Sequence, residues 1–405
     1  MPLGKAPPRL HPLDRSNRVD TLNRWLESAW SRGLSNYPSL EADVLREKAG
    51  GVAETSARSA EDTKDFDERL DALCAALSEE AQLNSLGRTI AHGQLSRVIN
   101  LRSDLGTLWG KRPELLETQL APPIIVVGQM RSGTTRIHRL LAADPAHSAT
   151  RFCDSWAPVP PRAKNKPDLR PLWSSMALAM ARAVNPWLDT VHPFGAARAD
   201  EELGWLAGAL DHATYEAQWR IPTFSRWSEV RDAAPLAREF ARILRSDASH
   251  AGNTHLPRVM KCPQFSEILP ELIEQFPDAR LVIASRDDDA VLHSCISLVA
   301  NQMAVQSDTA DLGWIENEWR RKLVLRNDRL NAALADFTGP VTHLPFAELN
   351  ADPIAAITRA YAELEMGLTP QALTAMRREL KRNERSSHHD HSAQLDEFFK
   401  TQNAP

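Results

Sequence analysis

One stretch limits what this chain can fold into more than any other: VVGQMRSGTTR, from Val126 to Arg136. The β-branched residues that lead into it favour a strand, and two glycines, Gly128 and Gly133, bound the turn that follows. Small residues let backbone N–H groups point inward, and a helix that starts at such a turn adds its positive N-terminal end. The stretch therefore predicts a strand, an anion-binding turn and a helix in succession.

The spacing of the two glycines matches the phosphate loop of NTPases, G-x-x-x-x-G, except at the next position. Thr134 stands where those enzymes need a lysine that reaches the β- and γ-phosphates. The cation of this turn is instead Arg131, three places earlier, beside the hydroxyls of Ser132 and Thr135. The turn indicates a site for an anionic group, and an NTP-dependent kinase is kept as the alternative interpretation.

Apolar strands and helical patterns alternate from this turn onward. We expect strands at residues 124–127, 258–260, 281–284 and 341–344, each followed by a helix. Short, nearly continuous apolar strands between helices indicate a parallel sheet that is covered on both faces. The fold class is therefore α/β, and its ligands are expected beyond the carboxyl ends of the strands.

The remaining chain divides around this sheet. Residues 1–120 are expected to form an N-terminal helical region, and residues 121–405 the α/β domain. Within that domain, a long insert at about 150–255 holds six of the eleven tryptophans. We interpret the insert as a helical subdomain with tryptophans in its core. The same insert could also form a cap that lines a pocket for an apolar or aromatic acceptor, and the two interpretations are compatible.

Composition excludes several classes of protein. A net charge of -5, with 42% hydrophobic and 25% charged residues, does not favour disorder or a general attraction to nucleic acid. The apolar runs are too short for a membrane span, and no secretory signal opens the chain. Four dispersed cysteines without a CxxC pair suit a reducing cytoplasm rather than a zinc knuckle or a disulfide framework.

The motif GQMRSGTTRIHRLLAADP resembles the 5′-phosphosulfate loop of sulfotransferases that use 3′-phosphoadenosine-5′-phosphosulfate (PAPS), in particular the bacterial branch with an R-S-G-T-T core. The resemblance implies a P-loop-like phosphosulfate turn in a PAPS-dependent transferase. It further implies that five residues hold the 5′-phosphosulfate: Arg131, Ser132, Gly133, Thr134 and Thr135.

A second motif, RLVIASRDDDAVLHSCISL, is similar to the family's strand, loop and helix that bind the 3′-phosphate of the same nucleotide. The resemblance assigns this role to Arg286 and Ser294. An arginine at the end of a strand offers two parallel donors, and the serine lies about two turns into the next helix. The alternative is an ion pair of the arginine with Asp287 or Asp289.

A third stretch, RVMKCPQFSEILPELIEQFPDARLV, resembles the segment in which a lysine approaches the transferred sulfuryl group, here Lys261. Two departures from the cytosolic branch matter. Pro263 replaces its catalytic histidine, and Arg136 replaces the tryptophan that stacks on adenine, so this arginine either stacks by a cation–π contact or pairs elsewhere. The basic C-terminal loop is also absent, and Lys381, Arg382 and Arg385 are its possible substitutes.

The resemblance implies transfer of a sulfuryl group to a hydroxyl or amine of a small-molecule acceptor, with 3′-phosphoadenosine-5′-phosphate (PAP) as the second product. Alignment and charge stabilisation, by Arg131 and Lys261, do most of such work, and no metal is required. A base that takes the acceptor proton is still needed. Asp154 ranks first, and the reserve candidates are His192, Glu201 and Glu202.

The sequence is also consistent with two other functions. A nucleotide-binding protein that has lost catalysis is a further alternative, because the histidine is missing. The cluster of His388, His389 and His391 invites a metal interpretation, which we disfavour because no further ligands accompany it at a regular spacing. The acceptor and the oligomeric state are not determined by the sequence.

Overall fold

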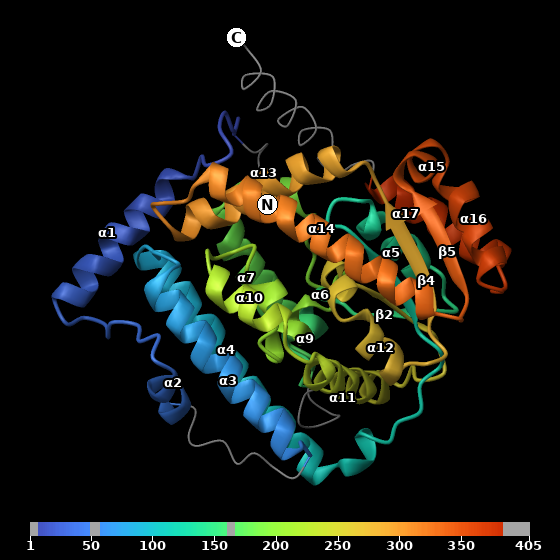
Figure 1. The fold of residues 1–405 in the computed structure, drawn as a ribbon, viewed down its shortest axis with the longest axis horizontal. Coiled ribbons are helices and arrows are strands. Elements are labelled where there is room, and N and C mark those ends of the chain that lie inside the picture. Colours follow the sequence, from blue (N-terminus) through green and yellow to red (C-terminus); the bar gives the residue numbers. More distant parts are fainter. Residues whose placement is uncertain (1–6, 49–56, 160–166, 384–405) are drawn as a thin grey trace.

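The computed structural model describes residues 7–48, 57–159 and 167–383 (Figure 1). At its centre lies a sheet of five parallel strands in the order β2-β3-β1-β4-β5. The strands are β1 (Ile124–Gly128), β2 (Ser148–Ala149), β3 (Arg258–Lys261), β4 (Arg280–Ser285) and β5 (Val341–Pro345). The predicted α/β class with a parallel sheet is confirmed.

Strand β1 shows why the sheet is covered on both faces. Ile125 and Val127 belong to one core cluster, with helices between β2 and β3 and helices between β3 and β5. Ile124 and Val126 belong to another, with the helix that follows β1 and two helices that follow β5. Successive side chains of a strand point to opposite faces, so a run of four buried apolar residues fills both layers. The continuous apolar pattern of the sequence has this physical origin.

All four expected strands are present, and each extends one or two residues beyond the expected range. The fifth strand, β2, was not predicted. It contributes two residues, Ser148 and Ala149, which pair with Arg258 and Val259 of β3 at the edge of the sheet. A two-residue strand is too short to produce an alternating pattern in the sequence.

Four helices and a short 3₁₀ turn precede the sheet. They are α1 (Asn17–Ser31), α2 (Ala42–Lys48), α3 (Ala60–Glu79), α4 (Ser85–Lys111) and η1 (Pro113–Leu115). The apolar faces of α3 and α4 share one core cluster with the insert, including Tyr215, Trp219 and Phe224. The N-terminal helices therefore pack on the insert. The exact division of the chain into domains stays a prediction.

The insert between β2 and β3 is helical, as expected. It comprises α6 (Phe152–Trp156), α7 (Arg170–Val184), α8 (Leu188–Val191), α9 (Leu203–Gly208), η2 (His212–Thr214), α10 (Pro222–Glu229) and α11 (Ala234–Ala251). Trp187, Trp205 and Trp219 are buried, which confirms their core role. Trp173 is exposed instead.

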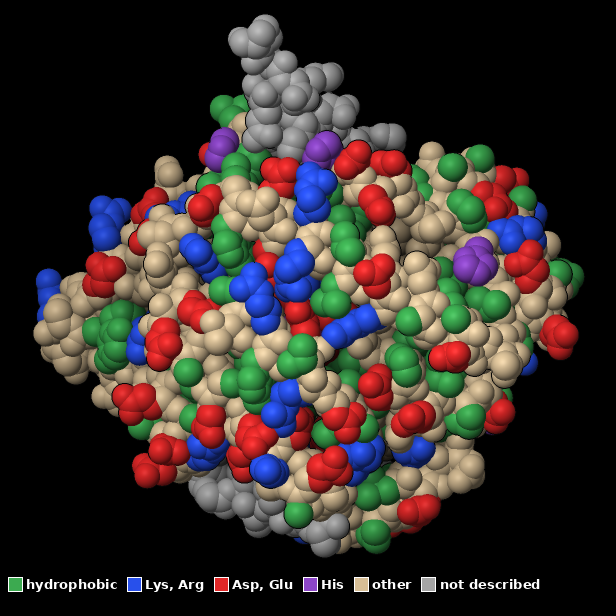
Figure 2. All heavy atoms as spheres, viewed as in Figure 1, with side chains coloured by type: hydrophobic (Ala, Val, Ile, Leu, Met, Phe, Trp, Pro, Cys, Tyr) green, Lys and Arg blue, Asp and Glu red, His purple; other side chains and the backbone are tan. Residues whose placement is uncertain are grey.

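The remaining elements are α5 (Thr134–Ala142), η3 (Pro263–Glu267), α12 (Leu269–Gln275), α13 (Asp288–Gln306), α14 (Leu312–Asp336), α15 (Phe346–Ala351), α16 (Pro353–Glu363) and α17 (Pro370–Asn383). No helix in the described ranges has the length and apolar character that crossing a bilayer requires. The four cysteines are buried and free of disulfides. Acidic and basic side chains are interspersed over the face shown in Figure 2, in line with the small net charge.

Candidate functional site

The turn after β1 has a backbone that few sequences can adopt. Gly128, Arg131 and Gly133 have positive φ angles of 153°, 69° and 93°. A Cβ atom on Gly128 would lie 2.3 Å from the carbonyl oxygen of Ala284 on the neighbouring strand β4, so glycine is required there. A positive φ at a residue with a side chain is uncommon and is typical of functional turns.

Helix α5 begins at Thr134, directly after this turn. The first N–H groups of a helix lack acceptors within the helix, so they can bind an anion. The hydroxyl and the N–H of Ser132 both donate to the carbonyl of Gln129, at 2.7 and 3.2 Å, and thereby close the turn on itself. The amide of Gln129 in turn donates to Asn327 Oδ1 of α14 at 2.6 Å, which holds the turn against that helix.

The two motifs assigned to the nucleotide phosphates meet in space. Arg286 Nη1 donates to the carbonyl oxygen of Arg131 at 2.9 Å, across 155 residues of sequence. Arg131 Nε donates to Ser294 Oγ at 2.8 Å. The guanidinium of Arg286 lies 4.4 Å from the ring centre of Phe346. It forms no salt bridge with a described residue, although the charge of Asp287 opposes the lowering of its pKa by burial. The alternative ion pair is therefore not found.

Electrostatics at this meeting point favour an anion. Burial lowers the pKa of the Arg131 guanidinium, and Cys295 opposes this shift. The neighbouring charge of Arg286 lowers the pKa further, and Glu201 opposes it most weakly. Burial also lowers the pKa of Arg286. Two partly desolvated cations side by side repel each other, so a bound phosphate would relieve this repulsion.

Lys261 lies at the carboxyl end of β3, beside β1, and is fully buried. Its ammonium donates to Thr135 Oγ1 of the phosphosulfate turn at 3.1 Å and forms a salt bridge with the Glu201 carboxylate. Its backbone N–H donates to Glu202 Oε2 at 2.9 Å. The lysine thus joins the phosphosulfate turn to the acidic residues of the insert.

A histidine and a second carboxylate complete this cluster. His192 Nε2 lies 2.9 Å from Asp200 Oδ1, and its Nδ1 lies 4.0 Å from Glu201 Oε1. Burial opposes ionisation of Asp200, yet His192 and Lys261 outweigh it and lower the pKa of this carboxyl. The three residues could in principle hold a metal ion. The ammonium of Lys261 already supplies the positive charge that Glu201 requires.

Glu202 differs from its neighbour in its surroundings. It is fully buried, and burial raises the pKa of its carboxyl to about 8, although the N–H of Lys261 opposes the shift. A carboxylic acid that stays protonated near neutral pH is a poor proton acceptor there. Its hydrogen bond to the backbone of Lys261 indicates a role in holding the end of β3.

Asp154 lies on α6, and its carboxylate is bound by two arginines. Arg151 donates to both oxygens, at 2.6 and 2.8 Å, and Arg170 lies 3.3 Å from one of them. Such bidentate pairing occupies the lone pairs that a base would use. These contacts fit a residue that fixes α6 to the start of α7.

Two further expectations concern Arg136 and the basic residues near the C-terminus. Arg136 Nη1 donates to Asn350 Oδ1 at 3.3 Å, so it pairs with α15, and stacking on a base stays a prediction. Lys381 and Arg382 lie near the end of α17. Arg385 and the histidine cluster at 388–391 lie outside the described residues.

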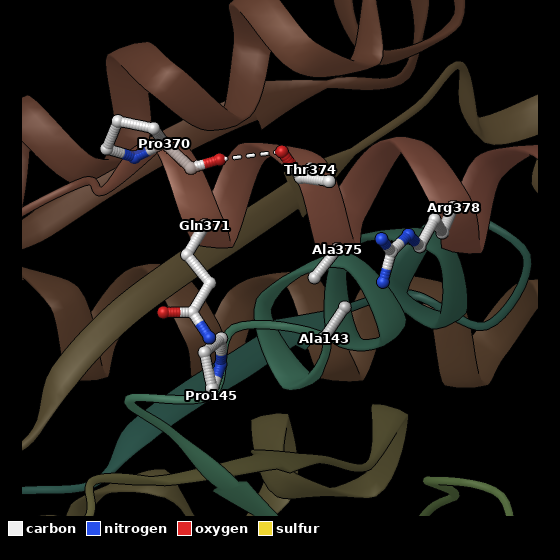
Figure 3. Close-up of a pocket in the computed structure, with 7 residues that line it drawn as sticks. All are labelled: Ala143, Pro145, Pro370, Gln371, Thr374, Ala375 and Arg378. Atoms are coloured by element: carbon white, nitrogen blue, oxygen red, sulfur yellow. Dashed lines mark hydrogen bonds between the residues drawn. The ribbon is translucent and has the colours of Figure 1, made fainter.

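A surface hollow of about 520 Å³ lies away from these residues (Figure 3). Ala143 and Pro145 line it from the C-terminal end of α5, and Gln371, Ala375 and Arg378 line it from α17. The phosphosulfate turn is at the opposite end of α5, about 13 Å away along the helix axis. This hollow therefore belongs to a different region from the converging motifs.

Sequence reasoning missed three contributors to the site: Asp200, Gln129 and Phe346. The first two lie inside stretches that the sequence already marked, Asp200 directly before Glu201 and Gln129 directly after Gly128. Phe346 follows β5 and has no local signal, because its contact with Arg286 depends on how β5 pairs with β4.

Comparison with known proteins agrees with this geometry. The profile of the sulfotransferase family matches residues 122–370, more than half of the chain. Omega-hydroxy-beta-dihydromenaquinone-9 sulfotransferases of Mycobacterium bovis and Mycobacterium tuberculosis are 27% identical over 203 residues, which is 47% of this chain and 48% of theirs. The match thus spans about half the length of these relatives.

Two solved structures share the fold. Sulfotransferase STF1 from Mycobacterium tuberculosis superposes with a TM-score of 0.73 at 24% identity, covering 90% of this chain and 99% of the other. Sulfotransferase STF9 from Mycobacterium avium gives 0.74 at 19% identity, covering 89% and 95%. By its sequence profile, and in agreement with this fold, the chain belongs to the sulfotransferase family.

Proposed function

We propose that the protein transfers a sulfuryl group from PAPS to a hydroxyl or amine of a small, apolar acceptor. The observation that carries this proposal is the convergence of the R-S-G-T-T turn with Arg286 and Ser294. A nucleotide with anions at both the 5′ and 3′ positions of one ribose needs two neighbouring phosphate sites. A kinase needs only one such site, together with the lysine that Thr134 replaces.

The turn and the N-terminus of α5 hold the 5′-phosphosulfate in this proposal, through Arg131, Ser132, Gly133, Thr134 and Thr135. Arg286 and Ser294 hold the 3′-phosphate. When the donor binds, its 3′-phosphate replaces part of the contact between Arg131 and Ser294, and its anionic oxygens relieve the repulsion between the two arginines.

Lys261 and Glu201 carry the chemical step. The acceptor oxygen or nitrogen attacks sulfur while the bond from sulfur to the 5′-phosphate oxygen breaks, and PAP leaves with the electron pair. Lys261, already in contact with Thr135, stabilises the charge that develops on the departing oxygen. Glu201 takes the acceptor proton once the lysine has turned from it to the donor.

His192 and Asp200 position that base. The histidine lies 2.9 Å from the buried Asp200 carboxylate and 4.0 Å from Glu201. In this proposal it receives the proton from Glu201 after the two side chains move into hydrogen-bond distance. Asp154 ranks behind Glu201, because two arginines occupy its carboxylate. The donor, the acceptor class and the order of these candidates are all part of the proposal.

The acceptor class draws on the relatives. Their name specifies an omega-hydroxyl on a dihydromenaquinone, which is a hydroxyl on an apolar molecule. For this chain we propose the same chemical class of acceptor, a hydroxyl on an apolar molecule.

Transfer of radiolabelled sulfonate from PAPS to a panel of apolar alcohols, phenols and amines tests the function. We expect labelled product with at least one class, and a rise in melting temperature with PAP that Arg286→Ala removes. A rise with ATP and magnesium but not with PAP would favour the kinase instead. Binding of PAP without transfer to any acceptor would indicate a nucleotide-binding protein that has lost catalysis.

A further inference from the structure

Helix α7 exposes an apolar surface that is unusual for a helix in water. Leu178 is its buried residue, while a stripe of larger apolar side chains faces solvent. The members and their exposed fractions are Leu169 at 45%, Leu172 at 53%, Trp173 at 60%, Met176 at 50% and Met180 at 71%. Apolar residues at this spacing normally face a core.

The stripe runs along one side of the helix for most of its length. Trp173, Met176 and Met180 are three and four residues apart, so they lie one above another. With Leu169 just before the helix, the stripe covers eleven residue steps, about 16 Å. A continuous apolar band of this length indicates a partner surface rather than isolated exposed residues.

The two arginines of α7 are paired with aspartates, Arg170 with Asp168 at 2.9 Å and Arg182 with Asp189 at 2.7 Å. The helix sequence, RPLWSSMALAMARAV, contains no aspartate or glutamate, although the chain as a whole is acidic. Arg18 of α1 donates to the carbonyl oxygen of Ala183 at 2.7 Å, and this exposed arginine pairs with no described carboxylate. Among the described residues, one exposed cation without a carboxylate partner therefore lies at the C-terminal end of the apolar helix, and this cation favours an anionic partner.

The position of α7 connects this surface to the candidate site. At its start, Arg170 contacts Asp154 of α6 at 3.3 Å. At its end, the chain continues through α8 directly to His192 of the catalytic cluster. Near the end of α7, Arg182 donates to the carbonyl oxygen of Phe194 at 3.1 Å, and the Phe194 ring lies 4.4 Å from that of His192. The C-terminal end of α7 thus adjoins this cluster.

We propose that α7 lies on an anionic lipid surface, from which the protein takes an apolar acceptor. The apolar stripe enters the boundary between headgroups and acyl chains, while Arg18 contacts lipid phosphates. The acceptor part of this statement rests on the proposed sulfotransferase function, whereas binding to the lipid surface does not. Since no described helix can cross a bilayer, such contact is made by lying on the surface.

Co-sedimentation with vesicles tests the lipid contact. The full chain is mixed with vesicles of phosphatidylcholine alone or with phosphatidylglycerol, in the wild type and in the double variant Trp173→Glu/Met180→Glu. We expect the wild type to bind, more strongly with phosphatidylglycerol, and the double variant to bind at least about tenfold more weakly, since two large apolar groups are lost from the interface. Val324→Glu, at an exposed position of α14, is the matched control and should bind as the wild type does.

A second measurement separates this inference from the proposed function. Affinity for PAP and turnover of a water-soluble acceptor should be unchanged in the double variant, while turnover of an acceptor embedded in vesicles falls. The lipid contact is overturned if the wild type does not bind vesicles, or if the double variant binds them as strongly as the wild type does. A dimer that the double variant dissociates, without vesicle binding, would show that a second copy covers α7 and would overturn it as well.

Discussion

A buried network of charges around Lys322 allows a quantitative prediction of how a substitution changes the free energy of unfolding. Lys322 of α14 is almost fully buried, and its ammonium contacts three carboxylates: Glu229 at 2.9 Å, Glu267 at 2.8 Å and Glu216 at 3.2 Å. Removing one partner of a buried ion pair typically costs about 3–5 kcal/mol, because the remaining charge is left uncompensated. Arg326 still pairs with Glu216 and Glu267 after the lysine is removed. We therefore expect Lys322→Met to lower the free energy of unfolding by about 3 kcal/mol, the lower limit of this range.

Urea unfolding, followed by the fluorescence of the buried tryptophans, measures this loss. The matched control is Arg320→Met on the same helix, where an exposed arginine pairs with Glu316 at 3.0 Å. Exposed pairs of this kind contribute about 0.3–0.5 kcal/mol. Equal unfolding free energies for the two variants would refute the reasoning, since they would show that water reaches the ammonium of Lys322 and replaces its partners.

Three further predictions follow from single residues. Gly128→Ala should abolish PAP binding or folding, because the added Cβ would overlap a carbonyl oxygen of β4. Gly93→Ala on α4 is the control and should be tolerated, because nothing lies within 4 Å of the added Cβ. PAP titration and circular dichroism check both variants. Glu202 should contribute a loss of stability as pH rises from about 4.5 through 8, by up to about 1.4 kcal/mol per pH unit, because its raised pKa keeps a proton in the folded state that the unfolded chain has lost. Below about pH 6.5, His138 opposes this trend, because burial lowers its pKa to about 3. Glu202→Gln should lack the Glu202 contribution, so its free energy of unfolding should rise relative to that of the wild type as pH rises across this range. A difference that does not change with pH would contradict the assignment. Glu201→Gln should lower kcat by about 10²–10⁴-fold with PAP affinity retained, while Asp154→Asn should lower kcat less; the reverse order would restore Asp154 as the base.

The tight turn after β1 and the strands could be predicted because their signals are local, whereas the binding of phosphosulfate by this turn stays a prediction. Gly128 and Gly133 satisfy backbone requirements within a few residues, and β1 is a run of buried apolar residues. The second phosphate motif was also visible, since Arg286 and Ser294 belong to one strand, loop and helix. Their contact with Arg131 in the structure agrees with the prediction.

The order of candidate bases could not be predicted, because it depends on contacts between distant residues. Asp154 carries no local sign that Arg170, sixteen positions later, turns back to bind it. We propose Glu201 ahead of Asp154 because of its contact with Lys261, sixty residues away, which no local pattern shows. The exposure of α7 was equally hidden, since its apolar pattern is the same as that of a buried helix.

Calorimetric titration of PAP and of AMP into the wild type and Arg286→Ala tests the central claim most directly, since the two ligands differ only in the 3′-phosphate. The proposed double phosphate site predicts that the wild type binds PAP at least about tenfold more tightly than AMP, as expected for a charge-assisted contact, and that the variant binds the two ligands alike. A variant that keeps the full preference for PAP, or a wild type that shows none, would contradict the assignment of Arg286 to the 3′-phosphate.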